Sequence, residues 1–494
     1  MNFRIVAKIL GLLFILVGLA MGCCWLYASI ELHVAETGKP GASAVHSLSL
    51  STAITAGLGV VLYLIGWNCS NEVLRRDAIV IVGLGWVMAS ILGALPFVFC
   101  EPGLDFIGAV FESASGFTTT GSSVMTDIES FPRPILMWRA VTQWLGGIGI
   151  LVVFVAVLSF LGVGSRSLVQ QESSLNLSES GTSRIRDLAA ALLKVYLVLS
   201  VSCCLGLIFF GMSFFDAICH SMTTIATGGF SPKNTSIAHY GSAGIELWLS
   251  LFMFLSSIGF MFYVFLGNCR WNRVLAEEEA RYYLYLIAGL TGAIAVNLVL
   301  TGVHSSYPAA LRDAVFNVTS ISSTTGFGVS DYDRWPLSSK LLLMLLMLIG
   351  GCAGSTAGGL KMNRIILFFK ITLRELVRSY RPNRVFRIRL NGGAPSEEVF
   401  VTSLFFITLG VSVAGFSVLL VAMMEPGLDL ISVIGAVFGT LWNVGPGFGD
   451  VGPTDNFAFL KPPTLVLLSF LMVLGRLEFF ALLVLFVPSL WKKY

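Results

Sequence analysis

The chain has 494 residues, of which 55% are hydrophobic and only 12% are charged, and its formal net charge is +3. Soluble domains usually carry about 25% charged residues, so this composition excludes a soluble globular protein and indicates an all-α, polytopic membrane protein. The nine cysteines form no CxxC pair, so neither a zinc site nor a disulfide framework is suggested. No covalently bound cofactor is expected.

Ten apolar runs are long enough to cross a bilayer, which takes about 20 residues. The first, from Ile9 to Ile30, follows Arg4 and Lys8 like a signal peptide, but it is too long for one and we interpret it as a retained span. The other runs lie near residues 48–68, 78–100, 135–162, 188–212, 243–267, 281–303, 338–371, 399–424 and 463–490.

Four shorter segments share one pattern, in which an Asp is followed by a short apolar run, a polar tail and a glycine. They begin at Asp105, Asp216, Asp313 and Asp429. The first and the fourth follow the same five letters, EPGLD, at 101–105 and 425–429. This repetition predicts four pseudo-repeats. Each apolar part is too short to span a bilayer, so we interpret the segments as re-entrant pore helices whose tails line an aqueous path.

Basic residues are unevenly distributed between the two sides of the predicted spans. The loops on one side carry about three times as many Lys and Arg residues as the loops on the other side. Because cytoplasmic loops carry the excess, both termini are expected in the cytoplasm and the four repeated loops on the outside. The four aspartates are expected to cap the helix N-termini rather than to bind ions.

The polar tails predict a cation filter. Backbone carbonyls can replace the water around a monovalent cation, and glycine lets the chain turn them inward. The negative ends of four helix dipoles would favour cations further. Any one Thr-Gly ending could be a plain helix C-cap, but four copies make that reading weak. The candidate filter residues are Thr119, Thr120, Gly121, Ala226, Thr227, Gly228, Thr324, Thr325, Gly326, Asn443, Val444 and Gly445.

Five glycines stand within the ten residues from Gly350 to Gly359, inside an otherwise apolar run. Gly350, Gly354 and Gly358 could form a close-packed face of a continuous helix. The remaining glycines fall off that face and each weakens a helix by about 1 kcal/mol, so we favour a break in the helix.

Arg476 lies within the last apolar run, where a charge is costly unless it faces water or a partner. Two interpretations stay open. Arg476 either faces the pore as an electrostatic barrier, or it forms an ion pair with another helix, for example with Glu112.

Other classes of function are less compatible with the sequence. The five histidines are scattered and show no spacing suited to haem, and no HExxH or GxSxG motif is present, so no catalytic residues are expected. A secondary transporter is harder to exclude, because such proteins also use broken helices at the midplane.

Seven short motifs, taken together, resemble those of one family. They are TTTGSS at 118–123, QWLGGIGI at 143–150, ATGGFSP at 226–232, STTGFG at 323–328, GGCAGSTAGGLK at 350–361, NVGPGFG at 443–449 and GRLE at 475–478. The chain resembles the Trk/Ktr/HKT superfamily of potassium transporters, and most of all its bacterial TrkH/TrkG branch. In this family a filter glycine in every repeat accompanies potassium selectivity, which implies potassium uptake here. The fourth repeat departs from threonine, with Asn443 and Val444.

The resemblance implies four helix–pore-helix–helix units around one pore, preceded by two further transmembrane helices. The two helices are expected in residues 1–70, and the four repeats in 71–165, 183–268, 278–375 and 396–494. It also implies an intramembrane gate loop below the filter, with Lys361 at its inner end and Arg476 nearby. The expected gate residues in the loop itself are Gly350, Gly351, Gly354, Ser355, Thr356, Gly358 and Gly359.

The resemblance further implies a homodimer in the bacterial inner membrane, regulated by a cytoplasmic nucleotide-binding subunit of the TrkA type, with no role for nucleic acid. The basic stretch from Arg374 to Glu398 is either ordinary positive-inside bias or a docking surface for such a subunit or for anionic membrane lipid. The alternative function is a less selective Na⁺/K⁺ or H⁺-coupled secondary transporter.

Overall fold

The computed structural model describes residues 2–35, 39–69, 74–147, 149, 185–383, 388–391, 393, 395 and 397–491. Within these residues, all named secondary-structure elements are helices, and the β-structure consists of two isolated bridges. The second half of the span expected at 135–162 lies outside the described residues, as do Arg166, Arg184 and the basic pair Lys492 and Lys493. So do the expected repeat boundaries at 71, 165, 183, 396 and 494.

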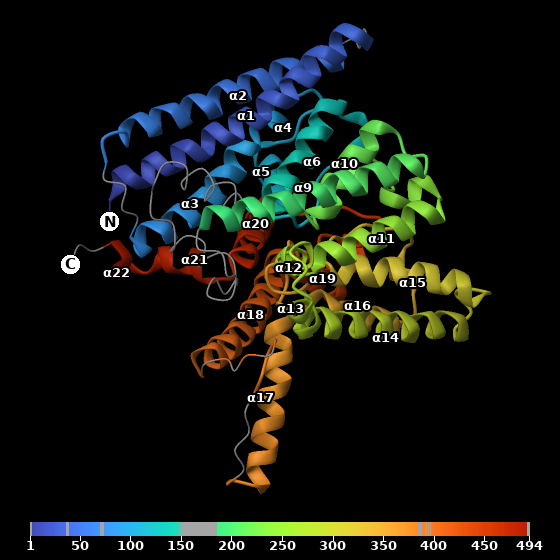
Figure 1. The fold of residues 1–494 in the computed structure, drawn as a ribbon. Coiled ribbons are helices and arrows are strands. Elements are labelled where there is room, and N and C mark those ends of the chain that lie inside the picture. The colour runs from blue at the N-terminus through green and yellow to red at the C-terminus, as the bar shows by residue number, and fades with distance from the viewer. Residues whose placement is uncertain are drawn as a thin grey trace.

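Two long helices open the chain and lie side by side along one edge of the molecule (Figure 1). They are α1 (Phe3–Ala35) and α2 (Lys39–Ile65). Their backbones approach closely at glycines, because a Cβ on Gly59 would lie 2.8 Å from both Gly11 O and Ile15 N. In a membrane, where the lipid is as apolar as the side chains, such close packing is a main source of helix association.

Four short helices correspond to the four repeated segments. They are α5 (Phe106–Phe117), α10 (Phe214–Ile225), α15 (Tyr307–Ser322) and α19 (Leu430–Leu441). Each lies in the chain between two other helices, namely α3 (Arg75–Gly93) and α6 (Arg133–Gly147), α9 (Ile185–Phe209) and α11 (Ala243–Ser257), α14 (Glu278–Leu300) and α16 (Leu337–Leu348), and α18 (Glu397–Met424) and α20 (Pro462–Arg476).

The four units are arranged as a closed ring. Each short helix packs against the second flanking helix of the preceding unit, so that α10 contacts α6, α15 contacts α11, α19 contacts α16, and α5 contacts α20. The last contact joins the first unit to the fourth. This packing brings the C-terminal ends of the four short helices together, although they are far apart in the sequence.

Six described helices are long and apolar enough to cross a membrane, or seven if α11 and α12 (Phe260–Gly267), which are bent by 91°, form one span. The prediction of ten continuous spans is therefore wrong in detail. The run at 338–371 is interrupted after Leu348, and the run at 463–490 is interrupted after Arg476. Glycines and a charge at these points weaken helix formation enough to break the apolar runs.

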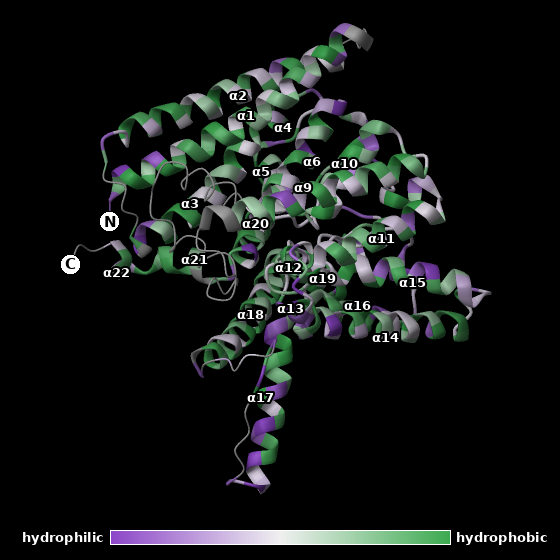
Figure 2. Ribbon diagram, in the orientation of Figure 1, coloured by the Kyte–Doolittle hydropathy of each residue, from purple (hydrophilic) through white to green (hydrophobic). Residues whose placement is uncertain are grey.

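The remaining elements are short, except for one. Helix α17 (Met362–Tyr380) projects away from the other helices (Figure 1), and polar and apolar residues alternate along it (Figure 2). The short elements are α4 (Leu95–Phe99), η1 (Ile128–Ser130), η3 (Ser236–Tyr240), α13 (Trp271–Ala276), η4 (Tyr332–Arg334), η5 (Gly449–Val451), α21 (Phe480–Leu483), η6 (Val484–Phe486) and α22 (Pro488–Trp491).

The close approach of α1 and α2 can be tested with one methyl group. Gly59→Ala should destabilise the protein by about 1–3 kcal/mol, because the methyl meets backbone that cannot move aside easily. Gly57→Ala is the matched control on the same helix, since nothing lies within 4 Å of its Cβ position. We expect a lower melting temperature in detergent for the first variant only, and equal melting of the two would refute this packing.

Candidate functional site

The four short helices end in the same backbone conformation. After each helix, one residue adopts the left-handed region, with φ of 53°, 55°, 57° and 54° at Thr119, Thr227, Thr324 and Asn443. The amide of the following residue then bonds a helix carbonyl five residues earlier in all four repeats, at 2.8–2.9 Å. Three of the four residues are threonines, for which this conformation is rare and costs about 1–3 kcal/mol, so the fold imposes it on them. Asn443 adopts it more readily.

The shared geometry fixes the register of the repeats. The residue two positions after each left-handed residue is a glycine with positive φ, namely Gly121 (91°), Gly229 (75°), Gly326 (79°) and Gly445 (102°). In the second repeat the structure therefore corrects the sequence-based register by one residue. The equivalent set is Thr227, Gly228 and Gly229, rather than Ala226, Thr227 and Gly228. In the other three repeats the predicted positions are equivalent as expected.

These four glycines form a ring with the carbonyl groups that precede them. A Cβ on Gly121 would lie closer than 3.0 Å to the carbonyl oxygen of Gly228 in the second repeat. The same relation recurs around the ring, from each glycine to the next repeat. The pairs are Gly121 with Gly228 O, Gly229 with Thr325 O, Gly326 with Val444 O, and Gly445 with Thr120 O. A side chain at any of the four positions would overlap a carbonyl oxygen of the neighbouring repeat.

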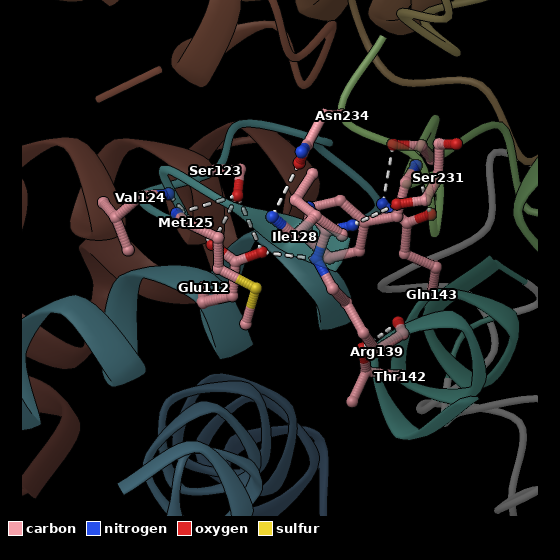
Figure 3. A network of polar contacts seen from close by, with 12 residues as sticks. Glu112, Ser123, Val124, Met125, Ile128, Arg139, Thr142, Gln143, Ser231 and Asn234 are labelled. Atoms are coloured by element: carbon pink, nitrogen blue, oxygen red, sulfur yellow. Dashed lines mark hydrogen bonds and ion pairs between the residues drawn. The ribbon is translucent and has the colours of Figure 1, made fainter. Parts of the chain in front are cut away.

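A buried ion pair between α5 and α6 supports the ring (Figure 3). Arg139 on α6 donates through Nε to Glu112 on α5 at 2.5 Å, and both side chains are buried. Glu112 also accepts the amide of Val124 at 3.0 Å, while Arg139 donates to the carbonyl of Ser231 at 2.9 Å. The pair therefore ties the segment after Gly121 to the segment after Gly229. Sequence reasoning missed Arg139, although an arginine in an apolar helix is itself a signal of a buried partner.

The fourth repeat breaks the symmetry with a side chain that crosses to the first repeat. The Asn443 amide donates to Thr120 Oγ1 at 2.8 Å and to the carbonyl of Met472 at 2.9 Å. Ser122 of the first repeat in turn donates to Gly445 O at 2.8 Å. The predicted departure from threonine thus has a structural role, since it joins the two ends of the repeat series.

The expected capping role of the aspartates holds in two repeats only. Asp105 and Asp429 are N-cap residues that accept the amides of Gly108 and Ser432. Asp216 lies inside its helix, whose cap is Ser213, and Asp313 lies well inside α15. The prediction is therefore wrong for these two, because their helices begin several residues earlier than the sequence pattern suggested.

The glycine-rich segment between α16 and α17 is not helical, which agrees with the predicted break and excludes a helical packing face. It contacts the C-terminal ends of two of the short helices, α15 and α10. The amide of Gly358 donates to Thr324 Oγ1 at 2.7 Å, and Thr356 Oγ1 donates to the carbonyl of Ile225 at 2.9 Å. Positive φ at Gly354 (72°) and Gly359 (69°) lets the segment fold back on itself.

Arg476 holds this segment in place. Its guanidinium donates to the carbonyl of Thr356 at 2.7 Å, and to Gly146 O at 2.7 Å and Gly147 O at 3.1 Å at the end of α6. The suggested ion pair between Arg476 and Glu112 is wrong, because Glu112 pairs with Arg139. Lys361, at the end of the segment, donates to the carbonyl of Ala357.

Comparison with known proteins agrees with this geometry. Residues 51–493 match the family model described as TrkH, a cation transport protein. The chain is 36% identical to the Trk system potassium uptake protein TrkH of Halomonas elongata and 37% identical to that of Escherichia coli K12, over the full length of each chain. The crystal structure of the potassium transporter TrkH from Vibrio parahaemolyticus superposes with a TM-score of 0.86 at 31% identity, covering 100% of both chains. The chain therefore belongs to the TrkH family of cation transport proteins.

Proposed function

We propose that the chain is a potassium uptake protein of the bacterial inner membrane, and that potassium crosses through the ring of four glycines. The observation that carries this proposal is the cyclic relation in which each glycine faces a carbonyl of the next repeat. The relatives from Halomonas elongata and Escherichia coli, both named as potassium uptake proteins, support the choice of ion.

The chemistry of the ring suits a dehydrated monovalent cation. The carbonyls of Thr120, Gly228, Thr325 and Val444 replace water as ligands, together with the side chains and carbonyls one residue earlier. The negative ends of four helix dipoles point to the ring and favour cations over anions. Because Arg139 neutralises Glu112, the ring itself holds a low net charge, so that an ion can bind and still leave.

The glycine-rich segment from Gly350 to Lys361 is proposed as the gate. It lies against the ring through Thr324 and Ile225 and is held by Arg476, which places a positive charge beside the ion path. Opening requires that these hydrogen bonds break together. The whole proposed gate consists of Gly350, Gly351, Gly354, Ser355, Thr356, Gly358, Gly359, Lys361 and Arg476.

We further propose that a cytoplasmic nucleotide-binding subunit of the TrkA type controls the gate, on a homodimer of this chain. The support is the direct chain connection from the gate segment to α17, which projects from the body and carries many basic residues. A subunit that moves α17 would pull on Lys361. The same proposal places both termini in the cytoplasm, as the distribution of Lys and Arg predicts.

The filter proposal predicts that Gly121→Ser raises sodium uptake relative to potassium, because the side chain displaces the carbonyl of Gly228. Gly211→Ser is the matched control, since Gly211 has a similar φ of 93° but nothing within 4 Å of its Cβ position. The measurement is the ratio of sodium to potassium uptake in vesicles. An unchanged ratio in Gly121→Ser would exclude Gly121 from the filter.

The gate proposal predicts that Arg476→Gln raises potassium flux by tenfold or more. The variant weakens charge-assisted hydrogen bonds to backbone carbonyls, which are worth about 1.5–3 kcal/mol each. Arg334→Gln, at an exposed arginine paired with Asp331, should leave the flux unchanged. Single-channel or vesicle flux measurements would decide, and an equal or lower flux at equal folded yield would contradict the gate.

The orientation predicts how introduced cysteines react with an impermeant reagent. Asp455→Cys should react from outside the cell, whereas Ser379→Cys on α17 should react only after the membrane is opened. Both positions are exposed, and the exposed native Cys23 and Cys269 would first be replaced by serine. A reversed pattern would overturn the inward direction of uptake.

A further inference from the structure

One side chain of α6 contacts the ring directly. Gln143 is fully buried, and its amide nitrogen donates to the carbonyl of Gly228 at 2.6 Å. Its amide oxygen accepts the backbone N–H of Phe230 at 3.0 Å. The carboxamide therefore bridges the two backbone groups on either side of Gly229, in the way that a neighbouring strand would. Figure 3 shows Gln143 on the same helix as Arg139.

This contact makes the second repeat different from the other three. Among the described residues, no hydrogen bond is formed to the carbonyls of Thr120, Thr325 or Val444, the other members of the ring. A carbonyl oxygen has two lone pairs, so the Gly228 oxygen can still meet an ion while it accepts from Gln143. It is, however, the one ring oxygen in the described structure that is fastened to a transmembrane helix.

The segment from Gly228 to Ser231 is also held by Arg139, another residue of α6. One turn before Gln143, Arg139 donates to the carbonyl of Ser231, and its guanidinium lies 3.5 Å from the centroid of the Phe230 ring. Because α6 is itself packed against α5 and α10, the segment from Gly228 to Ser231 has little freedom to move toward the pore axis.

Fastening one oxygen has a consequence for ion size. A sodium ion is smaller than a potassium ion, so the ring must contract to coordinate it as closely. The Gly228 oxygen cannot move inward without lengthening its bond to Gln143, whereas it can coordinate a larger ion where it stands. We propose that Gln143 is a positioning residue that sets ion specificity, by preventing the ring from contracting around sodium. This inference rests on the proposed filter.

Two variants test the contact from the Gln143 side. Gln143→Met conserves the volume but removes both hydrogen bonds, and it should raise the ratio of sodium to potassium uptake by about twofold to tenfold, as expected for one hydrogen bond. Gln143→Leu likewise removes both hydrogen bonds and adds no charge beside the ring, so it should raise the ratio by a similar factor. A wild-type ratio in either variant would overturn the inference.

A third variant changes Gly228, the partner of Gln143, and tests the contact if the Gln143 variants do not fold. Gly228 has no positive φ, and the closest atoms to a Cβ there are all in the Gln143 side chain. Gly228→Ala should therefore push the carboxamide away and raise the ratio as well, and an unchanged ratio would count against the inference. Ser200→Ala is the control, because it removes a hydrogen bond from Trp144, the next residue of α6, without touching the ring.

The outcome separates this inference from the proposed function. A ratio does not depend on the amount of folded protein, so a purely structural role of Gln143 would lower the yield and leave the ratio unchanged. If the unmodified chain shows no preference for potassium and Gly121→Ser changes nothing, the filter proposal itself fails. If Gly121→Ser changes the ratio and Gln143→Met does not, only the role of Gln143 is refuted.

Discussion

The structure depends on one steric constraint, namely that four glycines have no room for a side chain because a carbonyl oxygen of the next repeat occupies the space. Gly121, Gly229, Gly326 and Gly445 satisfy this constraint one per repeat, and the last closes the ring on the first. The strained left-handed residues before them cost free energy, which the packing of each pore helix against the preceding repeat must offset. A contact between neighbouring repeats is therefore the basic unit of the ring.

The surrounding polar groups follow from that ring. Backbone carbonyls that face an ion path cannot also be satisfied by secondary structure, so side chains must hold the backbone from behind. Glu112 and Arg139 hold the backbone of repeats 1 and 2 together, and Asn443 links repeat 4 to repeat 1. Removing one member of such a buried pair leaves an uncompensated charge and costs about 3–5 kcal/mol. The glycine-rich segment in turn hydrogen-bonds to Thr324 Oγ1 and to the carbonyl of Ile225, so the proposed gate is fastened directly to the ends of two of the short helices.

Much of this could be predicted from sequence, and the failures have physical reasons. Composition and the fourfold pattern predicted the helical membrane fold and, in three of the four repeats, the positions that share one backbone conformation. The second repeat was shifted because Gly228 and Gly229 are adjacent, and only backbone geometry shows which of them has positive φ. The prediction that Asp216 and Asp313 cap their helices was wrong because both helices begin earlier in the chain. The predicted ion pair of Arg476 was wrong because its hydrogen bonds to backbone carbonyls cannot be recognised in the sequence.

In the proposed filter, an ion occupies the centre of a ring to which each repeat contributes one glycine. Anomalous diffraction from crystals grown in rubidium, a potassium substitute with a strong signal, would locate the ion directly. The account predicts a peak enclosed by the carbonyls of Thr120, Gly228, Thr325 and Val444. Ordered rubidium elsewhere along the pore, with none at this ring, would contradict it.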